Sequence, residues 1–295
     1  MPTTFTDDLR LAHVLADDAD SLTTNRFRAQ DLHVVNKPDL TPVTDADKSV
    51  EEGIRRTLSR ARPRDAVLGE EMGSTGHSQR RWVVDPIDGT KNFVRGVPVW
   101  ATLIALMVDD EVVVGCVSAP QLQRRWWASQ DGGAWTGRSL LRATECHVSD
   151  VARLDDASLS YASFHGWEER DRLDAFMALA RRCWRTRAYG DFWSYMLVAE
   201  GAVDIAAEPD LELYDMAALD IIVREAGGSF TSLDGTPGPM GGNALATNGR
   251  LHEQALAFLG SRPDDEDDPD VSRRGPGSVH DLSSRRRAPA QPDEQ

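Results

Sequence analysis

Residues 82–93 read Trp-Val-Val-Asp-Pro-Ile-Asp-Gly-Thr-Lys-Asn-Phe, an apolar run that passes into two carboxylates and a glycine. The apolar part predicts a short strand over residues 81–84 that presents Asp85 at its end. Pro86 has no backbone N–H for a sheet, so we expect the strand to stop there. Asp88 can turn back toward Asp85 if a helical turn begins in this loop. The stretch therefore predicts a pair of carboxylates suited to a hard cation.

The residues after Asp88 offer a place for an anion. Gly89 permits a close approach of the backbone, and the amides of Gly89 and Thr90 can point at a phosphate where a helix starts. Asp and Gly are also common in surface turns, so a turn without chemistry is the alternative for this motif taken alone.

Two other segments carry acids at the ends of apolar elements. Residues 67–69 read as a strand that leads into Glu70, and Asp215 stands at the start of a very apolar helix predicted over residues 216–226. A lone acid at a helix start is usually a cap. Because three separate element ends each present carboxylates, we interpret them as parts that converge on one site.

The wider pattern predicts strands in the first half and alternating strands and helices in the second, which favours a layered α+β or α/β protein. We expect a first half over residues 1–142 with the main metal motif. The second half, residues 143–260, should hold the second metal motif and the substrate pocket. Residues 261–295 have almost no apolar side chains, so we expect a disordered tail. Predicted helices cover residues 7–20, 44–58, 171–183, 192–200 and 216–226, and predicted hairpins cover residues 100–117 and 125–136.

The composition limits the class of protein. A formal net charge of −15 disfavours a nucleic-acid partner, because binding to phosphate backbones needs clustered cations. No stretch approaches the roughly 20 apolar residues that span a bilayer, and the acidic N-terminus lacks the pattern of a signal peptide. The three cysteines have no metal-ligand spacing and fit reduced thiols. We therefore expect a cytoplasmic protein without a membrane partner.

Together the acidic motifs resemble those of the inositol-monophosphatase-like enzymes. Two segments are similar to the diagnostic motifs of that family and two to its supporting motifs, in the family's order and spacing. The resemblance covers about Thr4 to Gly260 and departs at Tyr214, where tryptophan is common. The matching segments are residues 41–47, 69–71, 85–93 and 214–218, the last of which runs into residues 225–228.

The resemblance implies a layered αβαβα sandwich that forms a homodimer and hydrolyses phosphate monoesters with two or three Mg²⁺ ions per active site. Glu70, Asp85, Asp88 and the carbonyl of Ile87 would hold one ion. Asp85, Asp88 and Asp215 would hold a second, and Glu70 with water a weaker third. Hard oxygen ligands without His or Cys fit Mg²⁺ rather than zinc.

The resemblance also implies which residues do the chemistry. Asp47 and Thr90 are similar to the family's water-activating pair and, with Glu70, would prepare a metal-activated water for in-line attack. The amides of Gly89 and Thr90 would hold phosphate oxygens. A non-catalytic metal-binding regulator is an alternative of another class. Such a scaffold would tend to lose Asp47, Glu70 or Thr90, and all three are present.

Residues 187–195, Arg-Ala-Tyr-Gly-Asp-Phe-Trp-Ser-Tyr, bear on the choice of substrate. They resemble the histidinol-phosphatase branch, in which an aromatic-Gly-Asp-aromatic run is typical, whereas inositol-selective members usually carry Gly-Ser or Gly-Thr followed by small residues. The implied reaction is hydrolysis of L-histidinol phosphate to L-histidinol and phosphate, in histidine biosynthesis. An inositol-1-monophosphatase, or another small phosphate-ester phosphatase of the family, is the alternative.

Histidinol phosphate carries an ammonium and an imidazole that can be protonated, so its pocket should present carboxylates and flat rings. The candidate rings are Phe192, Trp193 and Tyr214. The alternative for Phe192, Trp193 and Tyr195 is the core face of a helix. The predicted substrate contacts are Asp88, Arg187, Asp191, Glu208 and Asp215, among which Asp191 and Glu208 would meet the cationic end.

Overall fold

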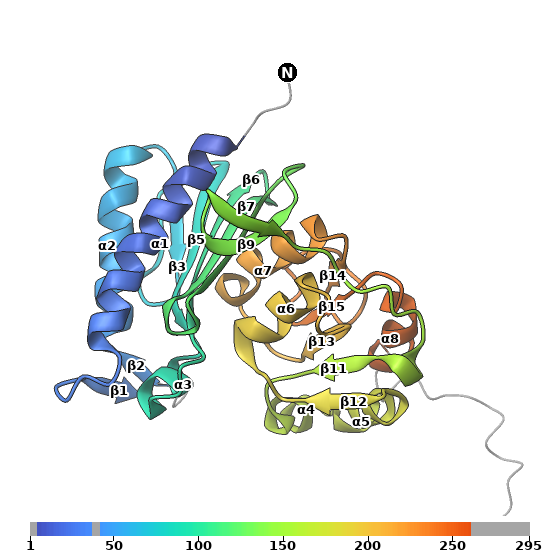
Figure 1. Ribbon diagram of the computed structural model, residues 1–295. Coiled ribbons are helices and arrows are strands. Elements are labelled where there is room, and N and C mark those ends of the chain that lie inside the picture. Colours follow the sequence, from blue (N-terminus) through green and yellow to red (C-terminus); the bar gives the residue numbers. More distant parts are fainter. Residues whose placement is uncertain (1–4, 37–41, 261–295) are drawn as a thin grey trace, which may run out of the picture. The chain divides into compact units, whose positions relative to one another are not determined.

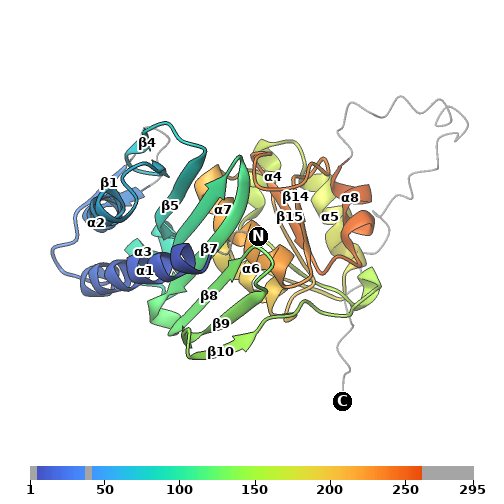
Figure 2. The same ribbon diagram turned by 90° about the horizontal axis from the view of Figure 1, so that it is seen from above.

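The computed structural model describes residues 5–36 and 42–260, so the tail predicted over residues 261–295 lies outside the described residues. Within the described part, helices lie on both outer faces of two sheets and also between the sheets (Figure 1). The view from above in Figure 2 shows the same order of layers. The expected αβαβα sandwich is confirmed.

The helices and strands have the following bounds. The helices are α1 (Thr6–Arg26), α2 (Asp45–Ala61), α3 (Thr90–Arg95), α4 (Phe164–Glu169), α5 (Leu173–Arg182), α6 (Asp191–Ala199), α7 (Leu213–Glu225) and α8 (His252–Leu259). Strands β1 (Val34–Asn36) and β2 (Pro42–Thr44) form a small pair. The large sheet holds β3 (Ala66–Gly69), β4 (Gly73–Thr75), β5 (Arg80–Asp88), β6 (Ala101–Val108), β7 (Glu111–Ala119), β8 (Arg124–Ser129), β9 (Ala134–Ser139) and β10 (Arg142–Glu145). The small sheet holds β11 (Ser158–Ser160), β12 (Arg185–Arg187), β13 (Ile205–Glu208), β14 (Ser229–Thr231) and β15 (Ala244–Thr247).

The strand order brings two of the acidic motifs together. The large sheet has the order β10-β9-β8-β7-β6-β5-β3-β4, and β3 runs parallel to β5. The register pairs Gly69 with Val84, so Glu70 and Asp85 follow at the same edge of the sheet. The small sheet has the order β12-β11-β13-β15-β14.

Three apolar layers hold the sandwich together. Helices α1 and α2 cover one face of the large sheet, α6 and α7 lie between the two sheets, and α4, α5 and α8 cover the outer face of the small sheet. Both faces of each sheet are therefore buried, which explains the long apolar runs of β6 and β7. Buried side chains that mark the layers are Leu15, Ile54 and Trp82, then Trp126, Phe192 and Ile221, then Trp167, Phe176 and Leu245.

Helix α7 packs closely on β7, and a glycine makes this possible. A Cβ atom at Gly115 would lie 2.6 Å from Ile221 Cγ2 and 2.8 Å from the carbonyl oxygen of Ala218. These distances are shorter than van der Waals contact, so a side chain here would push α7 away from the sheet. Because Asp215 lies in the first turn of α7, this packing helps to set its position.

The expected helix after Thr44 and both expected hairpins are confirmed. The N-cap prediction for Thr44 is also correct: its Oγ1 accepts hydrogen bonds from the N–H groups of Ala46 and Asp47. A serine or threonine at this position satisfies amides that the helix leaves unpaired.

The prediction that the strand stops at Pro86 is wrong, because β5 continues to Asp88. The register of β5 with β6 shifts between Asp85 and Asp88, and this irregularity accommodates the residue that has no N–H. Thr102 Oγ1 donates a hydrogen bond of 2.8 Å to the carbonyl oxygen of Pro86. The bulge redirects the chain where the two aspartates are needed.

No helix within residues 5–36 and 42–260 is both long and apolar enough to cross a membrane. The three cysteines have unpaired thiols; Cys116 and Cys146 are buried and Cys183 is half-buried. By their contacts, the described residues belong to one compact unit. The division at residue 142 remains a proposal, and the chain leaves the large sheet at the end of β10.

Candidate active site

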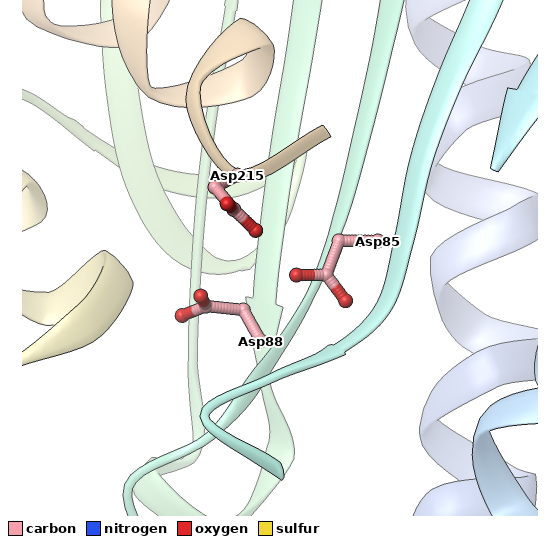
Figure 3. Close-up of side chains that lie close together, drawn as sticks. All are labelled: Asp85, Asp88 and Asp215. Carbon is pink, nitrogen blue, oxygen red and sulfur yellow. The ribbon is translucent and has the colours of Figure 1, made fainter. Parts of the chain in front are cut away.

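Three carboxylates from two distant parts of the chain meet at one end of the large sheet. Asp85 and Asp88 come from the end of β5, and Asp215 comes from the first turn of α7. Each offers an oxygen, and these oxygens lie within 4.8 Å of one another. Figure 3 shows the three side chains gathered at the end of β5 and the start of α7, with the carboxylates of Asp85 and Asp215 directed toward the space between them.

Backbone amides fix the orientation of each carboxylate. Asp85 Oδ1 accepts a 2.9 Å hydrogen bond from the N–H of Ile87. Asp88 Oδ2 accepts one of 2.8 Å from the N–H of Phe192, at the start of α6. Asp215 Oδ2 accepts one of 2.8 Å from the N–H of Glu212. The fold therefore holds the cluster in place through its backbone, as a preorganised site requires.

The cluster is electrostatically strained. Burial raises the pKa of Asp85 well above its usual range, and the charges of Glu70, Asp88 and Asp215 raise it further. Burial, followed by the charges of Asp191 and Asp215, does the same to the pKa of Asp88. Burial raises the pKa of Asp215 to about 7.

A bound cation would relieve both causes of this strain. Its attraction for the carboxylates offsets the free-energy cost of their desolvation, and its charge cancels their mutual repulsion. The donors are carboxylate oxygens throughout, which suit hard divalent cations rather than zinc. The residues present therefore fit a metal such as Mg²⁺.

The cluster forms one wall of a cavity of about 530 Å³. Most of the predicted site residues line it. The lining residues are Pro42, Glu70, Asp85, Ile87, Asp88, Gly89, Thr90, Lys91, Asp191, Asp210, Leu211, Glu212, Tyr214 and Asp215.

The backbone conformation and the surroundings of residue 89 strongly favour glycine. It precedes α3 in the left-handed conformation, with φ of 80°. A Cβ atom would lie 3.1 Å from the carbonyl oxygen of Val99 and 3.2 Å from Asp191 Oδ2. The left-handed backbone conformation disfavours any other residue, and the tight space adds to this preference, so the backbone of Gly89 and Thr90 lies directly against the cavity.

Asp47 lies behind Thr90. Its Oδ2 accepts hydrogen bonds from the N–H of Thr44 at 2.7 Å and from Thr44 Oγ1 at 2.5 Å. Thr90 Oγ1 lies 3.4 Å from Asp47 Oδ1 and donates a shorter bond of 2.9 Å to the carbonyl oxygen of Ile87. Burial raises the pKa of Asp47 to about 6. Thr90 lines the cavity, so Asp47 can reach a ligand through the Thr90 hydroxyl.

The predicted substrate residues divide into two groups. Asp191 lines the cavity, and its Oδ2 accepts a 3.0 Å hydrogen bond from Asn92 Nδ2. Burial raises its pKa, and the nearby Lys91 lowers it. Arg187 is instead exposed on β12 and donates to the carbonyl oxygen of Thr186, away from the cavity lining.

Glu208, at the end of β13, is buried just behind the lining. Burial raises its pKa well above the usual range, and the charges of Asp191 and Asp215 add to this effect. Its Oε1 atom has no hydrogen-bond partner among the described residues. The structure therefore brings Asp191 and Glu208 close to the metal cluster but leaves Arg187 outside.

The aromatic residues near Asp191 mostly belong to the core. Phe192 is fully buried, with its ring centroid 6.1 Å from that of Trp126, so the prediction that it could supply a pocket ring is wrong. Tyr195 is buried as well. Trp193 packs on Tyr189 and against the apolar core. Helix α6 lies between the two sheets, so opposite sides of the helix are both covered. Most of its aromatic rings are therefore buried.

Sequence reasoning missed three polar residues of the cavity. Lys91 lies within the quoted motif and could have been found there, because it follows Thr90 directly. Asp210 and Glu212 lie in the sequence between Glu208 and Asp215, where no apolar periodicity indicates which way a side chain points. Asp210 forms an ion pair with Arg170 at 2.5 Å.

Comparisons with known proteins agree with this geometry. Residues 8–262 match the model of the inositol monophosphatase family. A histidinol-phosphatase of Streptomyces coelicolor is 65% identical over 262 residues, covering 88% of this chain and 98% of that protein. A histidinol-phosphatase of Mycobacterium tuberculosis is 60% identical over 254 residues, covering 86% and 98%. A solved inositol monophosphatase from Zymomonas mobilis is 34% identical, with a TM-score of 0.77 and coverage of 87% and 99%.

Proposed function

The chain belongs to the inositol monophosphatase family, and from this premise we propose that it is a histidinol phosphatase, which hydrolyses L-histidinol phosphate to L-histidinol and phosphate in histidine biosynthesis. The observation that carries the proposal is a cluster of three carboxylates, one buried and two half-buried, in a cavity shared with Asp191, in a chain 65% identical to a relative of that name. It is a phosphoric monoester hydrolase of a metal-dependent family.

Mg²⁺ is the proposed metal, with two or three ions in each active site. Glu70, Asp85, Asp88 and the Ile87 carbonyl would hold one ion, Asp85, Asp88 and Asp215 a second, and Glu70 a weaker third. When bound, the metal neutralises charge on phosphoryl oxygens and lowers the pKa of water for attack.

The chain's own groups complete the reaction. The N–H groups of Gly89 and Thr90 orient the phosphate, since both residues line the cavity. The Thr90 hydroxyl positions the attacking water. Its oxygen accepts a proton from the water while its own proton passes to Asp47 Oδ1, which lies 3.4 Å from Thr90 Oγ1. A general base works best when its pKa is close to the working pH. Burial raises the pKa of Asp47 to about 6, which suits this role.

Charge favours a substrate with a cationic end. Beyond the metal cluster, the described lining includes the acids Asp191, Glu212 and Asp210, the last of which is paired with Arg170, against the single lining cation Lys91. An ammonium or imidazolium would gain charge-assisted hydrogen bonds there, whereas a neutral polyol would not. We keep Glu208 and Arg187 as proposed substrate contacts, although neither is part of the cavity lining.

The test is phosphate release from histidinol phosphate, inositol 1-phosphate, fructose 1,6-bisphosphate and adenosine 3′,5′-bisphosphate. We expect the highest kcat/KM on histidinol phosphate. A preference for inositol 1-phosphate would replace the proposed substrate and leave the phosphatase assignment intact. No release from any of the four esters would favour the non-catalytic alternative.

The family resemblance also supports a homodimer in the cytoplasm as part of the proposal. Light scattering of the purified protein would measure the mass in solution. A measured mass close to that of a single chain, about half of the mass expected for two chains, would contradict the dimer.

A further inference from the structure

A buried glutamate on α2, outside the cavity, contacts the loop that carries a proposed metal ligand. The side chain of Glu51 is fully buried. Its Oε2 accepts a 2.7 Å hydrogen bond from the N–H of Glu71, and its Oε1 accepts one of 3.2 Å from the N–H of Met72. One carboxylate therefore binds two successive amides of the turn that follows β3.

The same turn is tied to the large sheet on its other side. The N–H of Glu70 donates a 3.2 Å hydrogen bond to the carbonyl oxygen of Val84, the residue before Asp85. Glu70 itself lines the cavity. The backbone around Glu70 is thus held between β5 and the Glu51 carboxylate. Both contacts fix the position of Glu70 relative to Asp85.

A glycine leaves the space that the Glu51 carboxylate occupies. A Cβ atom at Gly69 would lie 2.1 Å from Glu51 Oε1 and 2.6 Å from Oε2. Gly69 is not in the left-handed region, so the requirement for glycine here comes from space and not from backbone conformation. The sequence Gly69-Glu70-Glu71 and the buried Glu51 are therefore two parts of one arrangement.

Arg55 holds the Glu51 carboxylate from the opposite side. Its Nε donates to Glu51 Oε1 at 2.7 Å, its Nη1 donates to Thr75 Oγ1 at 2.8 Å, and its Nη2 donates to the carbonyl oxygen of Gly73. A buried carboxylate needs such a partner, because desolvation of an unpaired charge is costly. The pair links α2 to β4 across the turn.

We infer that Glu51 is a positioning residue for metal binding: held by Arg55, its carboxylate fixes the turn after β3 so that Glu70 meets the ion. Glu51 is not among the residues that line the cavity, so it acts through Glu70. The inference rests on the proposed metal site, and the experiment below separates the two.

The test is Glu51→Gln, with Mg²⁺ binding measured by isothermal titration calorimetry. The amide keeps the size of the side chain but replaces one acceptor oxygen with an N–H₂ group. This group faces the Glu71 N–H in one orientation of the amide and the donors of Met72 and Arg55 in the other, so each orientation loses at least one hydrogen bond. Loss of an outer-shell partner typically costs about 10- to 100-fold in metal affinity. We expect the Kd for Mg²⁺ to rise by this factor. The Mg²⁺ concentration for half-maximal rate should rise in parallel, while kcat at saturating Mg²⁺ stays near that of the wild type.

Two matched controls lie on the same helix. Glu52 is the exposed neighbour, and Glu52→Gln removes the same charge without touching the turn. Ile54 is buried, and Ile54→Val should lower stability by about 0.5–1.5 kcal/mol without changing Mg²⁺ affinity. If Glu51→Gln binds Mg²⁺ as tightly as these controls, whatever its melting temperature, Glu51 is only structural and the inference is wrong.

A third variant, Glu70→Gln, distinguishes failure of the proposed metal site. If Glu70→Gln binds Mg²⁺ like the wild type, the ligand assignment is wrong and the inference falls with it. If Glu70→Gln weakens binding and Glu51→Gln does not, only the inference fails. Should Glu51→Gln not fold, Arg55→Lys replaces it. Lysine lacks the guanidinium group whose two Nη atoms reach Thr75 and Gly73. Weaker Mg²⁺ binding by this variant supports the inference, and unchanged binding overturns it.

Discussion

At the scale of single residues, the site depends on carboxylates that the fold holds together against their repulsion. Asp85, Asp88 and Asp215 each accept a hydrogen bond from one backbone N–H, so the backbone itself orients all three carboxylates. Burial and the repulsion between like charges raise the pKa of each of the three, so the cluster is unfavourable without a cation. Such a cluster is retained where function needs it.

Asp85 is the central test of this arrangement. Asp85→Asn keeps the size of the side chain but removes a charge proposed to serve two ions. We expect kcat to fall by more than about 100-fold, since even outer-shell partners cost about 10- to 100-fold. Removal of metal with EDTA should have the same effect on the wild type, and added Mg²⁺ should reverse it. Undiminished phosphate release in either experiment would show that the metal site is misassigned.

Thr90 should act on water and not on an ion. Its hydroxyl lies between Asp47 Oδ1 and the carbonyl oxygen of Ile87. Thr90→Ala should lower kcat by about 100-fold or more, in the range of general acid–base catalysis, with Mg²⁺ affinity little changed. Calorimetry of the variant measures the second quantity, and a large loss of Mg²⁺ binding would contradict the assigned role.

Asp191 should select the substrate. A charge-assisted hydrogen bond contributes about 1.5–3 kcal/mol, so Asp191→Asn should lower kcat/KM for histidinol phosphate about 10- to 100-fold. The asparagine oxygen can still accept the hydrogen bond from Asn92, which limits structural damage. Hydrolysis of p-nitrophenyl phosphate, which has no ammonium, should fall much less. Equal losses on both esters would mean that Asp191 is structural.

At the scale of elements, the site is assembled by the packing of α7 and α6 on the large sheet. Helix α7 brings Asp215 to the end of β5, and the start of α6 donates the N–H of Phe192 to Asp88. Close approach of α7 depends on the glycine in β7. Small shifts of these helices would separate the carboxylates.

Gly115→Ala tests that dependence. The added methyl would meet Ile221 and the Ala218 carbonyl at less than 3.0 Å, so we expect a loss of about 1–3 kcal/mol in the free energy of unfolding, as overpacking usually costs. Gly53→Ala on α2 is the matched control, because its Cβ would only contact Leu22 at 3.7 Å. Alanine in a helix interior should stabilise by about 0.5–1 kcal/mol. Urea denaturation measures both, and equal effects of the two changes would refute the packing argument.

At the scale of the whole molecule, the five layers of the described residues enclose the apolar cores, and these layers form the fold and the site. The C-terminal 33 residues from Pro263 contribute a run of acids and then arginines. Their sequence has few apolar anchors that could pack on the sandwich.

Removal of residues 263–295 should therefore leave both the melting temperature and kcat/KM unchanged. Termini that are not tied to a core are usually dispensable. Thermal denaturation and phosphate release of the truncated chain measure the two quantities. A drop of several degrees would indicate that the segment packs on the domain.

The sequence by itself determined the local elements and the identity of the acids. Apolar runs on either side of short polar turns predicted the two hairpins, Thr44 marked the start of α2, and the motif around Asp85 marked the site. These signals are local, because side-chain periodicity, caps and turns depend on neighbours within a few residues. The order of the motifs then indicated the family and its sandwich.

Tertiary structure alone decided which side chains face the cavity. It placed Asp191 in the cavity and Phe192 in the core, left Arg187 outside, and bound the buried Glu51 to the turn that carries Glu70. The hydrogen bond from Phe192 to Asp88 joins residues 104 positions apart. Such contacts follow from how layers pack, since one residue of rotation or register moves a side chain from cavity to core, and no short stretch of sequence contains that information.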